Sequence, residues 1–193
     1  MKAPSRFHSF VVWENAFSPA ELDAIIAIGD RLKLDEAVVG YSGDDDQIED
    51  PVRSTRIAWM EPDAGNSWIY QRLEGVTRAL NEQVYHYDLG GFADPFQYSV
   101  YSSERNGHFG WHADQFERPV PRKLSFSLQL SDPDSYEGCD LEIFGGSTRK
   151  AVAAPRTRGA LIAFPSYVMH RVTPIRSGTR KALILWAGGP HFR

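Results

Sequence analysis

The stretch LSFSLQL, residues 124–130, alternates apolar and polar side chains without interruption. Successive side chains of a β-strand point to opposite faces of its sheet, so this alternation predicts a strand with two different faces. Ser125, Ser127 and Gln129 would lie together on one face, and the apolar residues would lie on the other.

Short strand-like runs follow this stretch, and clusters of Gly, Pro, Asp and Ser separate them. Clusters of this kind form turns, so we expect the second half of the chain to be a succession of short strands. The runs are Leu141–Phe144, Ala160–Phe164 and Lys181–Trp186.

Two helix-like segments precede the strands. Ser18 and Glu21 have the spacing of a capping box, with Pro19 at the first helical position, and they predict a helix over about residues 19–32. An apolar stripe at helical spacing predicts a second helix over about residues 67–85. Two helices followed by short strands indicate a mainly β fold, a sandwich buttressed by two helices in the N-terminal half, rather than an alternating parallel sheet.

The composition is typical of a soluble globular chain. Its 193 residues suit one domain over residues 1–193, and 42% of them are hydrophobic and 24% charged. A net charge of −4 argues against a nucleic-acid partner, and no apolar run reaches the ~18 residues of a membrane span. Cys139 is the only cysteine, which excludes an internal disulfide, and residues 1–8 lack an apolar signal core. We therefore expect a cytoplasmic protein, while its oligomeric state is left open.

The segment Gly107–Asp114, GHFGWHAD, holds a histidine and an aspartate two positions apart. Residues two apart on an extended segment project to the same side, so His112 and Asp114 can converge on one metal ion. His170 follows after a predicted strand and a turn. It completes a set of two histidines and one carboxylate, the facial arrangement that holds Fe(II). The alternative is a surface pair of His112 and Asp114, with His170 packed as a half-buried strand residue.

Arg180 immediately precedes the last strand-like run and, by alternation, shares a face with Ala182, Ile184 and Trp186. A guanidinium on an otherwise apolar face costs free energy unless an anion meets it. The small Ala182 leaves volume for a ligand, and Trp186 would form a wall of that volume. The alternative is a structural salt bridge between Arg180 and an aspartate or glutamate.

Several motifs of the chain resemble those of the 2-oxoglutarate/Fe(II) dioxygenases of the prolyl 4-hydroxylase-like superfamily, and they occur in the same order along the sequence. Within this superfamily, the chain resembles a bacterial and phage-type branch. The resemblance is closest from about Phe96 to the C-terminus. Its pieces are Gln97–Tyr101, Gly107–Asp114, Arg122–Ser125, Tyr136–Gly138, Gly159–Ser166, His170–Pro174, Gly178–Arg180 and Trp186–Phe192.

This resemblance implies a double-stranded β-helix, or jelly roll, with a helical buttress over about residues 1–95 and a catalytic core over about residues 96–193. It assigns the iron to His112, Asp114 and His170, the three residues already singled out.

By the same resemblance, Arg180 pairs with the C5 carboxylate of 2-oxoglutarate. Gln129 stands where some relatives have a tyrosine that binds this cosubstrate. Tyr101 matches a tyrosine of the cosubstrate pocket, with Tyr98 as the alternative, and Trp186 is expected to line the pocket.

The implied activity is hydroxylation with Fe(II), 2-oxoglutarate and O2, with release of succinate and CO2 and with ascorbate (vitamin C) as an optional reductant. Relatives that halogenate have a small residue in place of Asp114, so the carboxylate favours hydroxylation. The implied substrate is a peptide or protein side chain. The alternatives are a small-molecule hydroxylase and a non-catalytic jelly-roll module that retains the metal.

The chain departs from the family pattern at Cys139, where many relatives have the second glycine of Tyr-x-Gly-Gly-x-Leu. We expect a buried apolar side chain there, with a redox-sensitive thiol as the alternative. Arg53, Arg56 and Trp59 correspond to a region that borders the substrate mouth, although packing or surface salt bridges would also explain them. The acidic stretch Tyr41–Asp50 is expected to be a solvated loop, with a lid over the mouth as the alternative hypothesis.

Overall fold

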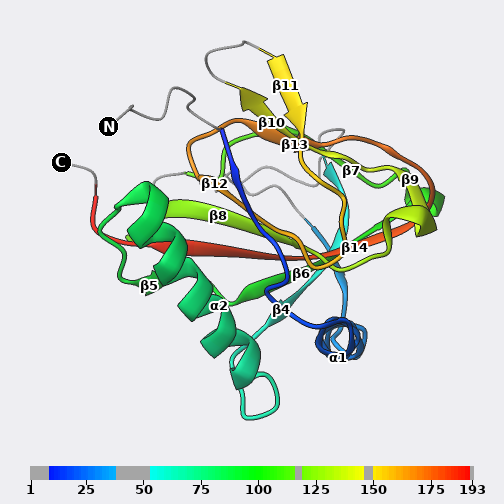
Figure 1. The fold of residues 1–193 in the computed structure, drawn as a ribbon. Helices are drawn as coiled ribbons and strands as arrows, with labels where there is room; N and C mark the ends of the chain where they lie inside the picture. Colours follow the sequence, from blue (N-terminus) through cyan, green and yellow to red (C-terminus); the bar gives the residue numbers. More distant parts are fainter. Residues whose placement is uncertain (1–8, 38–52, 116–118, 146–149, 192–193) are drawn as a thin grey trace.

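Two antiparallel sheets and two helices form the computed structural model, which describes residues 9–37, 53–115, 119–145 and 150–191 (Figure 1). The acidic stretch Tyr41–Asp50 lies outside these residues, and so does the lid hypothesis for it. Neither helix in the described ranges combines the length and the apolar content needed to span a membrane.

The larger sheet, called here the major sheet, has nine strands in the described residues, and β8 and β14 lie at its centre. Two short strands, β5 (Gly91–Phe92) and β9 (Tyr136–Gly138), pair with β14 outside the main order. That order is β1 (Val11–Trp13), β12 (Leu161–Pro165), β8 (Arg122–Gln129), β14 (Ile175–Gly188), β6 (Phe96–Ser102), β4 (Arg56–Met60) and β2 (Asp35–Glu36).

The smaller, minor sheet has five strands in the described residues. Their order is β11 (Lys150–Ala153), β10 (Leu141–Gly145), β13 (His170–Val172), β7 (His108–His112) and β3 (Arg53–Ser54).

The stretch at residues 124–130 forms most of β8, which confirms the predicted strand. Leu124, Phe126 and Leu128 are fully buried in a core on the helical side of the major sheet. Ser127 and Gln129 are buried as well, because the minor sheet covers the other face of β8.

The first helix, α1 (Pro19–Gly29), begins at the predicted capping box. The Glu21 amide donates to Ser18 Oγ at 3.3 Å, and the Ser18 amide donates to Glu21 Oε2 at 2.7 Å. The helix ends at Gly29, three residues earlier than predicted, because the chain closes there with a tighter turn in which Leu32 N–H donates to the carbonyl of Gly29. Leu32 still packs against the core, and this explains why its apolar spacing looked helical.

The second helix, α2 (Ser67–Leu80), continues into a π-helical turn over Asn81–Tyr85, so the predicted range of 67–85 is confirmed in two helical geometries. Ile69 and Leu73 of α2 pack with Ile25 of α1 and Phe126 of β8 in the first core.

A second core lies between the two sheets. It takes Tyr101 and Phe164 from the major sheet and Ile143 and Val172 from the minor sheet. Figure 1 shows the resulting layers, with β10, β11 and β13 toward the top, the central strands in the middle and the helices below. This arrangement confirms the predicted mainly β jelly roll with two buttressing helices.

Candidate metal centre and anion pocket

His112, Asp114 and His170 meet on the inner side of the minor sheet. His112 ends β7 and His170 begins β13, and these two residues are paired across the sheet. Their possible ligand atoms and those of Asp114 all lie within 4.8 Å of one another. His112 Nε2 is 3.7 Å from Asp114 Oδ1, and His170 Nε2 is 3.5 Å from Asp114 Oδ2. The structure therefore brings together the three residues that the sequence singled out.

A β-bulge in β7 sets the direction of His112. His170 pairs with His112 and Val172 pairs with Phe109, so three steps on β7 match two steps on β13. The extra residue turns Phe109 and His112 to the same face, where their rings stack with centroids 3.5 Å apart. Strict alternation would have placed these two residues on opposite faces, so the sequence pattern did not reveal this contact.

Both imidazoles are held with Nε2 toward Asp114. His112 Nδ1 lies 2.8 Å from the carbonyl oxygen of Gly110, and His170 Nδ1 lies 3.0 Å from that of Val168. A carbonyl oxygen only accepts, so Nδ1 carries the proton and donates, which leaves the Nε2 lone pair free. Burial and the nearby charge of His170 lower the pKa of His112 to about 4, and at neutral pH the ring is therefore in its metal-binding form.

Asp114 is held as a buried carboxylate, with 5% of its surface exposed. Ser125 Oγ donates to Asp114 Oδ2 at 2.7 Å and lies 2.9 Å from Ser166 Oγ. Burial alone would raise the pKa of Asp114, but the two imidazoles and the Ser125 hydrogen bond outweigh it and lower the pKa. Two imidazole nitrogens and one carboxylate oxygen match the facial set that binds Fe(II).

Arg180 supplies a buried cation on the same side of the major sheet, with 2% of its surface exposed. Its Nε and Nη2 donate to Gln129 Oε1 at 3.2 and 2.9 Å. Its Nη1 is buried and has no hydrogen-bond partner among the described residues. Within those residues no carboxylate forms an ion pair with Arg180, so the alternative of a structural salt bridge finds no acceptor there. A buried donor left open costs about 1–3 kcal/mol, which an anionic ligand would relieve.

The two tyrosines of β6 point to opposite sides of the major sheet. Tyr101 lies in the second core, and the Arg180 Cζ is 5.4 Å from the centroid of its ring. Tyr98 lies in the first core, where its hydroxyl donates to Asp30 Oδ1 at 2.7 Å. The prediction of Tyr98 as the alternative to Tyr101 is therefore wrong, because three positions along a strand reverse the face.

Trp186 lies at the end of the site nearest Asp114, because it pairs with Ser125 across β14 and β8. Its ring is 3.6 Å from the Cζ of Arg122, which forms an ion pair with Asp94 at 2.8 Å. The indole N–H of Trp186 is buried and lies near enough to the Asp114 carboxylate to contribute to its lowered pKa, although it has no acceptor within hydrogen-bond distance in the described residues. Trp186 thus lies beside the metal end of the candidate site, away from Arg180, and its role as a wall of the pocket stays a prediction. Sequence reasoning did not single out the ion pair that supports it, since Asp94 lies just outside the recognised motifs, three residues before Gln97.

The three residues expected at the substrate mouth take different places. Arg53 lies over the ring of Phe109, with Cζ 4.4 Å from its centroid, and is close enough to His112 to contribute to lowering its pKa. Trp59 is 42% exposed, and its ring centroid is 6.1 Å from that of Trp186. Arg56 pairs with Val100, a residue of the first core, so the register turns Arg56 away from the site.

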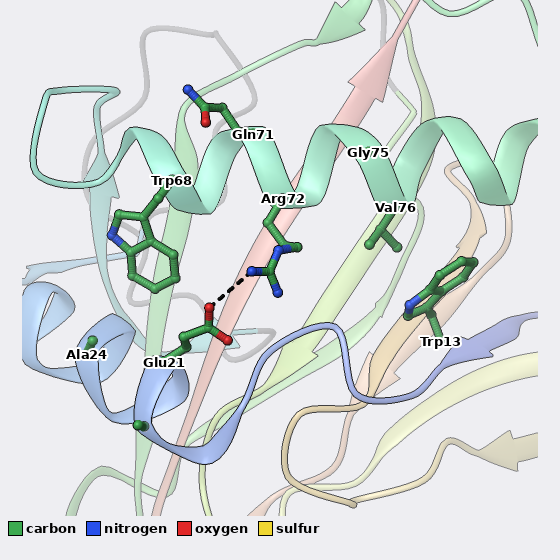
Figure 2. Close-up of a pocket in the computed structure, with 9 residues that line it drawn as sticks. Trp13, Glu21, Ala24, Trp68, Gln71, Arg72, Gly75 and Val76 are labelled. Carbon is green, nitrogen blue, oxygen red and sulfur yellow. Dashed lines mark hydrogen bonds and ion pairs between the residues drawn. The ribbon is translucent and has the colours of Figure 1, made fainter.

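A surface cavity of about 780 Å³ lies between α1, α2 and β1, on the helical side of the major sheet (Figure 2). Trp68 and Trp13 lie toward its two ends, and Arg72 reaches into it to pair with Glu21 at 3.1 Å. None of the three candidate metal ligands lines this cavity. The metal centre and the cavity are therefore separate features of the molecule.

Comparison with known proteins agrees with this geometry. Residues 96–188 match the model of the 2OG-Fe(II) oxygenase superfamily. This segment, just under half of the chain, is thus similar to the oxygenases of that superfamily. A PKHD-type hydroxylase of Teredinibacter turnerae (strain ATCC 39867 / T7901) is 35% identical over 120 residues, which is 58% of this chain and 46% of that protein. The chain thus spans about half the length of the curated relatives that it matches.

Solved structures of oxygenases share the fold. A Pseudomonas putida prolyl-4-hydroxylase superposes with a TM-score of 0.76 at 19% identity, over 95% of this chain and 94% of that chain. A prolyl hydroxylase from Trichoplax adhaerens, in complex with a hypoxia inducible factor oxygen degradation domain peptide fragment, gives a TM-score of 0.75 at 15% identity, over 93% of this chain and 83% of that chain.

The match to the 2OG-Fe(II) oxygenase superfamily implies Fe(II), 2-oxoglutarate and O2. The donors of this chain fit the first two: a nitrogen, nitrogen and oxygen set for the metal, and the open Nη1 of buried Arg180 for a carboxylate. Ascorbate stays a prediction.

Proposed function

We propose that this protein is an Fe(II)- and 2-oxoglutarate-dependent dioxygenase that hydroxylates an unactivated carbon. The observation that carries the proposal is the pair of sites on one side of the major sheet. Three ligand atoms lie within 4.8 Å of one another, and a buried guanidinium on the same side has a free donor. The 35% identical relative, a PKHD-type hydroxylase, supports the same class of reaction.

The residues divide the work between the two ends of the pocket. His112, Asp114 and His170 would hold Fe(II) through their Nε2 and carboxylate atoms. Arg180 would hold the C5 carboxylate of 2-oxoglutarate through Nη1, while Gln129 fixes the guanidinium by accepting from its other two nitrogens.

The iron, when bound, supplies the chemistry that couples oxidative decarboxylation of 2-oxoglutarate to succinate and CO2 with transfer of one oxygen atom of O2 to the substrate. The protein contributes position and environment. The Nδ1 hydrogen bonds of the two histidines fix their ligand nitrogens, and Ser125 keeps Asp114 ionised and in place. Burial of Arg180 and Tyr101 keeps water out of the anion pocket and strengthens the charge interaction there.

We propose a peptide or protein side chain as the substrate. The Trichoplax hydroxylase of the same fold was solved with a peptide fragment, which supports a peptide. The exposed Trp59 beside Trp186 offers an aromatic surface at the metal end, where an extended segment can lie. The experiment below must distinguish this peptide substrate from a small-molecule substrate.

Succinate release tests the proposal. The purified full chain would be incubated with Fe(II), 2-oxoglutarate and O2, first with pooled peptides and then with pooled amino acids and other metabolites. We expect succinate formation above the substrate-free rate with the peptides, and loss of that formation in His170→Ala. Stimulation by metabolites alone would identify a small-molecule hydroxylase. Metal binding with no succinate under any condition would contradict the dioxygenase and identify a binding module.

Arg180→Ala separates the two ends of the pocket. We expect 2-oxoglutarate binding to weaken by about tenfold to a hundredfold, since a charge-assisted pair contributes roughly 1.5–3 kcal/mol. Metal affinity should stay as in the parent protein, because Arg180 is not a ligand. Isothermal titration with Mn(II) in place of Fe(II) measures both constants without turnover.

A further inference from the structure

The turn after β9 has an unusual residue at its end. Gly138 and Cys139 both have left-handed backbones, with φ of +71° and +56°. A Cβ at Gly138 would lie 2.4 Å from the Pro174 carbonyl oxygen, so glycine is required at that position. Cys139 takes a conformation that costs an L-residue about 1–2 kcal/mol and that glycine adopts freely. A strained residue of this kind is a reason to look for a role of its side chain.

The side chain of Cys139 lies in the second core, 1% exposed, in the cluster that also holds Tyr101 and Tyr136. β9 brings this turn alongside the first half of β14, where Tyr136 pairs with Gly178, two positions before Arg180. Burial raises the pKa of the Cys139 thiol, and the adjacent Arg180 guanidinium only partly opposes that rise. The thiol therefore stays protonated and leaves the charge of Arg180 available to another anion.

The unpaired Nη1 of Arg180 indicates where that anion would bind. Arg180 is 2% exposed and its Nη1 has no hydrogen-bond partner in the described part of the chain, whereas Gln129 accepts from both Nε and Nη2. The Arg180 Cζ lies 5.4 Å from the centroid of the Tyr101 ring, and the Cys139 thiol is close enough to the guanidinium to contribute to its raised pKa. A carboxylate at Nη1 would therefore lie near both side chains.

We propose that the side chain of Cys139 is the end wall of the pocket for the far carboxylate, and that it sets the chain length of the 2-oxo diacid that the protein accepts. This inference rests on the proposed function. The metal centre fixes one end of the diacid and Arg180 fixes the other, so a longer chain needs extra room at the Arg180 end. Removing the CH2–SH group of Cys139 supplies more volume than one added methylene takes.

The test compares 2-oxoglutarate with 2-oxoadipate, which is one methylene longer. Their dissociation constants would be measured by isothermal titration of the Mn(II)-loaded full chain under anaerobic conditions. We expect the parent protein to prefer 2-oxoglutarate by about tenfold or more, the scale of selectivity that one methylene gives in a closed pocket. Cys139→Gly should bring the two constants within about threefold, while Cys139→Ser, of nearly equal size, should keep the parental preference.

Two controls separate the wall from a general loosening of the core. Cys139→Gly relieves the left-handed backbone but removes a buried side chain, so the two effects oppose each other and its thermal midpoint should stay close to that of the parent protein. Ala154→Gly removes a methyl group from the same cluster, at a residue whose amide donates to the carbonyl of Leu141 in β10, and it should keep the parental preference.

The proposal is overturned if Cys139→Gly keeps the parental ratio of the two constants while Arg180→Ala still loses 2-oxoglutarate binding. If the parent protein binds neither diacid, or if Arg180→Ala binds both as before, the proposed function itself fails together with this inference.

Discussion

At the scale of single residues, the state of His112 links the metal centre to stability. Its folded-state pKa is about 4, against an ordinary value of 6.5. Between these two pH values the unfolded chain binds a proton that the folded chain does not, so the folded state loses stability as the pH falls through this window. The full shift corresponds to roughly 3 kcal/mol.

Urea unfolding of the metal-free protein at pH 7, 5.5 and 4.5 measures this loss. His112→Asn removes the titrating group and should flatten the dependence over the window. Asp114, whose pKa is lowered from 3.8, contributes stability that is lost only at still lower pH, so it does not confuse the comparison. Equal slopes for the parent protein and His112→Asn would show that His112 is not the group responsible.

A substitution at Ser125 tests whether its hydrogen bond holds the Asp114 carboxylate in place for the metal. Ser125→Ala removes the hydrogen bond to Asp114 Oδ2, and we expect Mn(II) affinity to fall by about tenfold to a hundredfold. Ser127→Ala is the matched control on the same face of β8, because Ser127 accepts from Gln129 and does not touch Asp114. A similar loss of metal affinity in both variants would mean that the strand, rather than this hydrogen bond, holds the carboxylate.

At the scale of elements, two glycines of the helices differ in what surrounds them. A Cβ at Gly29, the last residue of α1, would lie 2.5 Å from the ring of Tyr98, while one at Gly75 in α2 meets nothing within 4 Å. Gly29→Ala should therefore destabilise the protein by about 1–3 kcal/mol. Gly75→Ala should stabilise it by about 0.5–1 kcal/mol, because alanine favours the helix. Denaturant unfolding measures both, and equal effects would contradict the close contact of α1 with β6.

Much of this architecture could be read from the sequence, since periodicity reports how a segment meets its neighbours. The alternation at residues 124–130 predicts only a strand, and the capping box at Ser18 predicts only the start of a helix. The faces of β6 could not be predicted in this way, because Phe96 to Tyr101 are all buried and the strand is covered on both faces. Composition could not say which of Tyr98 and Tyr101 faces the site.

In the candidate site, too, some features could be predicted from the sequence and others depend on tertiary structure. The spacing of His112 and Asp114, with His170 after a further strand, could be recognised in the sequence because ligand types are few. The bulge that brings Phe109 against His112 depends on how β7 pairs with β13. The carbonyl oxygens that accept from the two Nδ1 atoms are in place only because of the local bend of the chain. Contacts of this kind arise only from tertiary structure, and no local pattern encodes them.

At the scale of the whole molecule, the major sheet separates two hydrophobic cores, one packed against the helices and one beside the candidate metal centre. Leu73 of α2 lies in the helical core, and Ile143 of β10 lies in the core that borders His170. Leu73→Ala should lower the free energy of unfolding by about 2–5 kcal/mol and leave the Mn(II) affinity of the folded protein unchanged. Ile143→Ala should lower both. Loss of metal affinity in Leu73→Ala at a temperature where it is fully folded would show that the two cores are coupled.

The register of β14 constrains how this chain can vary in evolution. Arg180 stands opposite Tyr101 and Trp186 stands opposite Ser125, so a single strand carries both ends of the pocket. Insertion or deletion of one residue between Arg180 and Trp186 would turn one of them into the helical core, because it reverses the face of every residue beyond it. Homologues should therefore differ in length at the connections between strands, and diversify inside the pocket only by exchanging side chains at fixed positions such as Ala182 and Ile184.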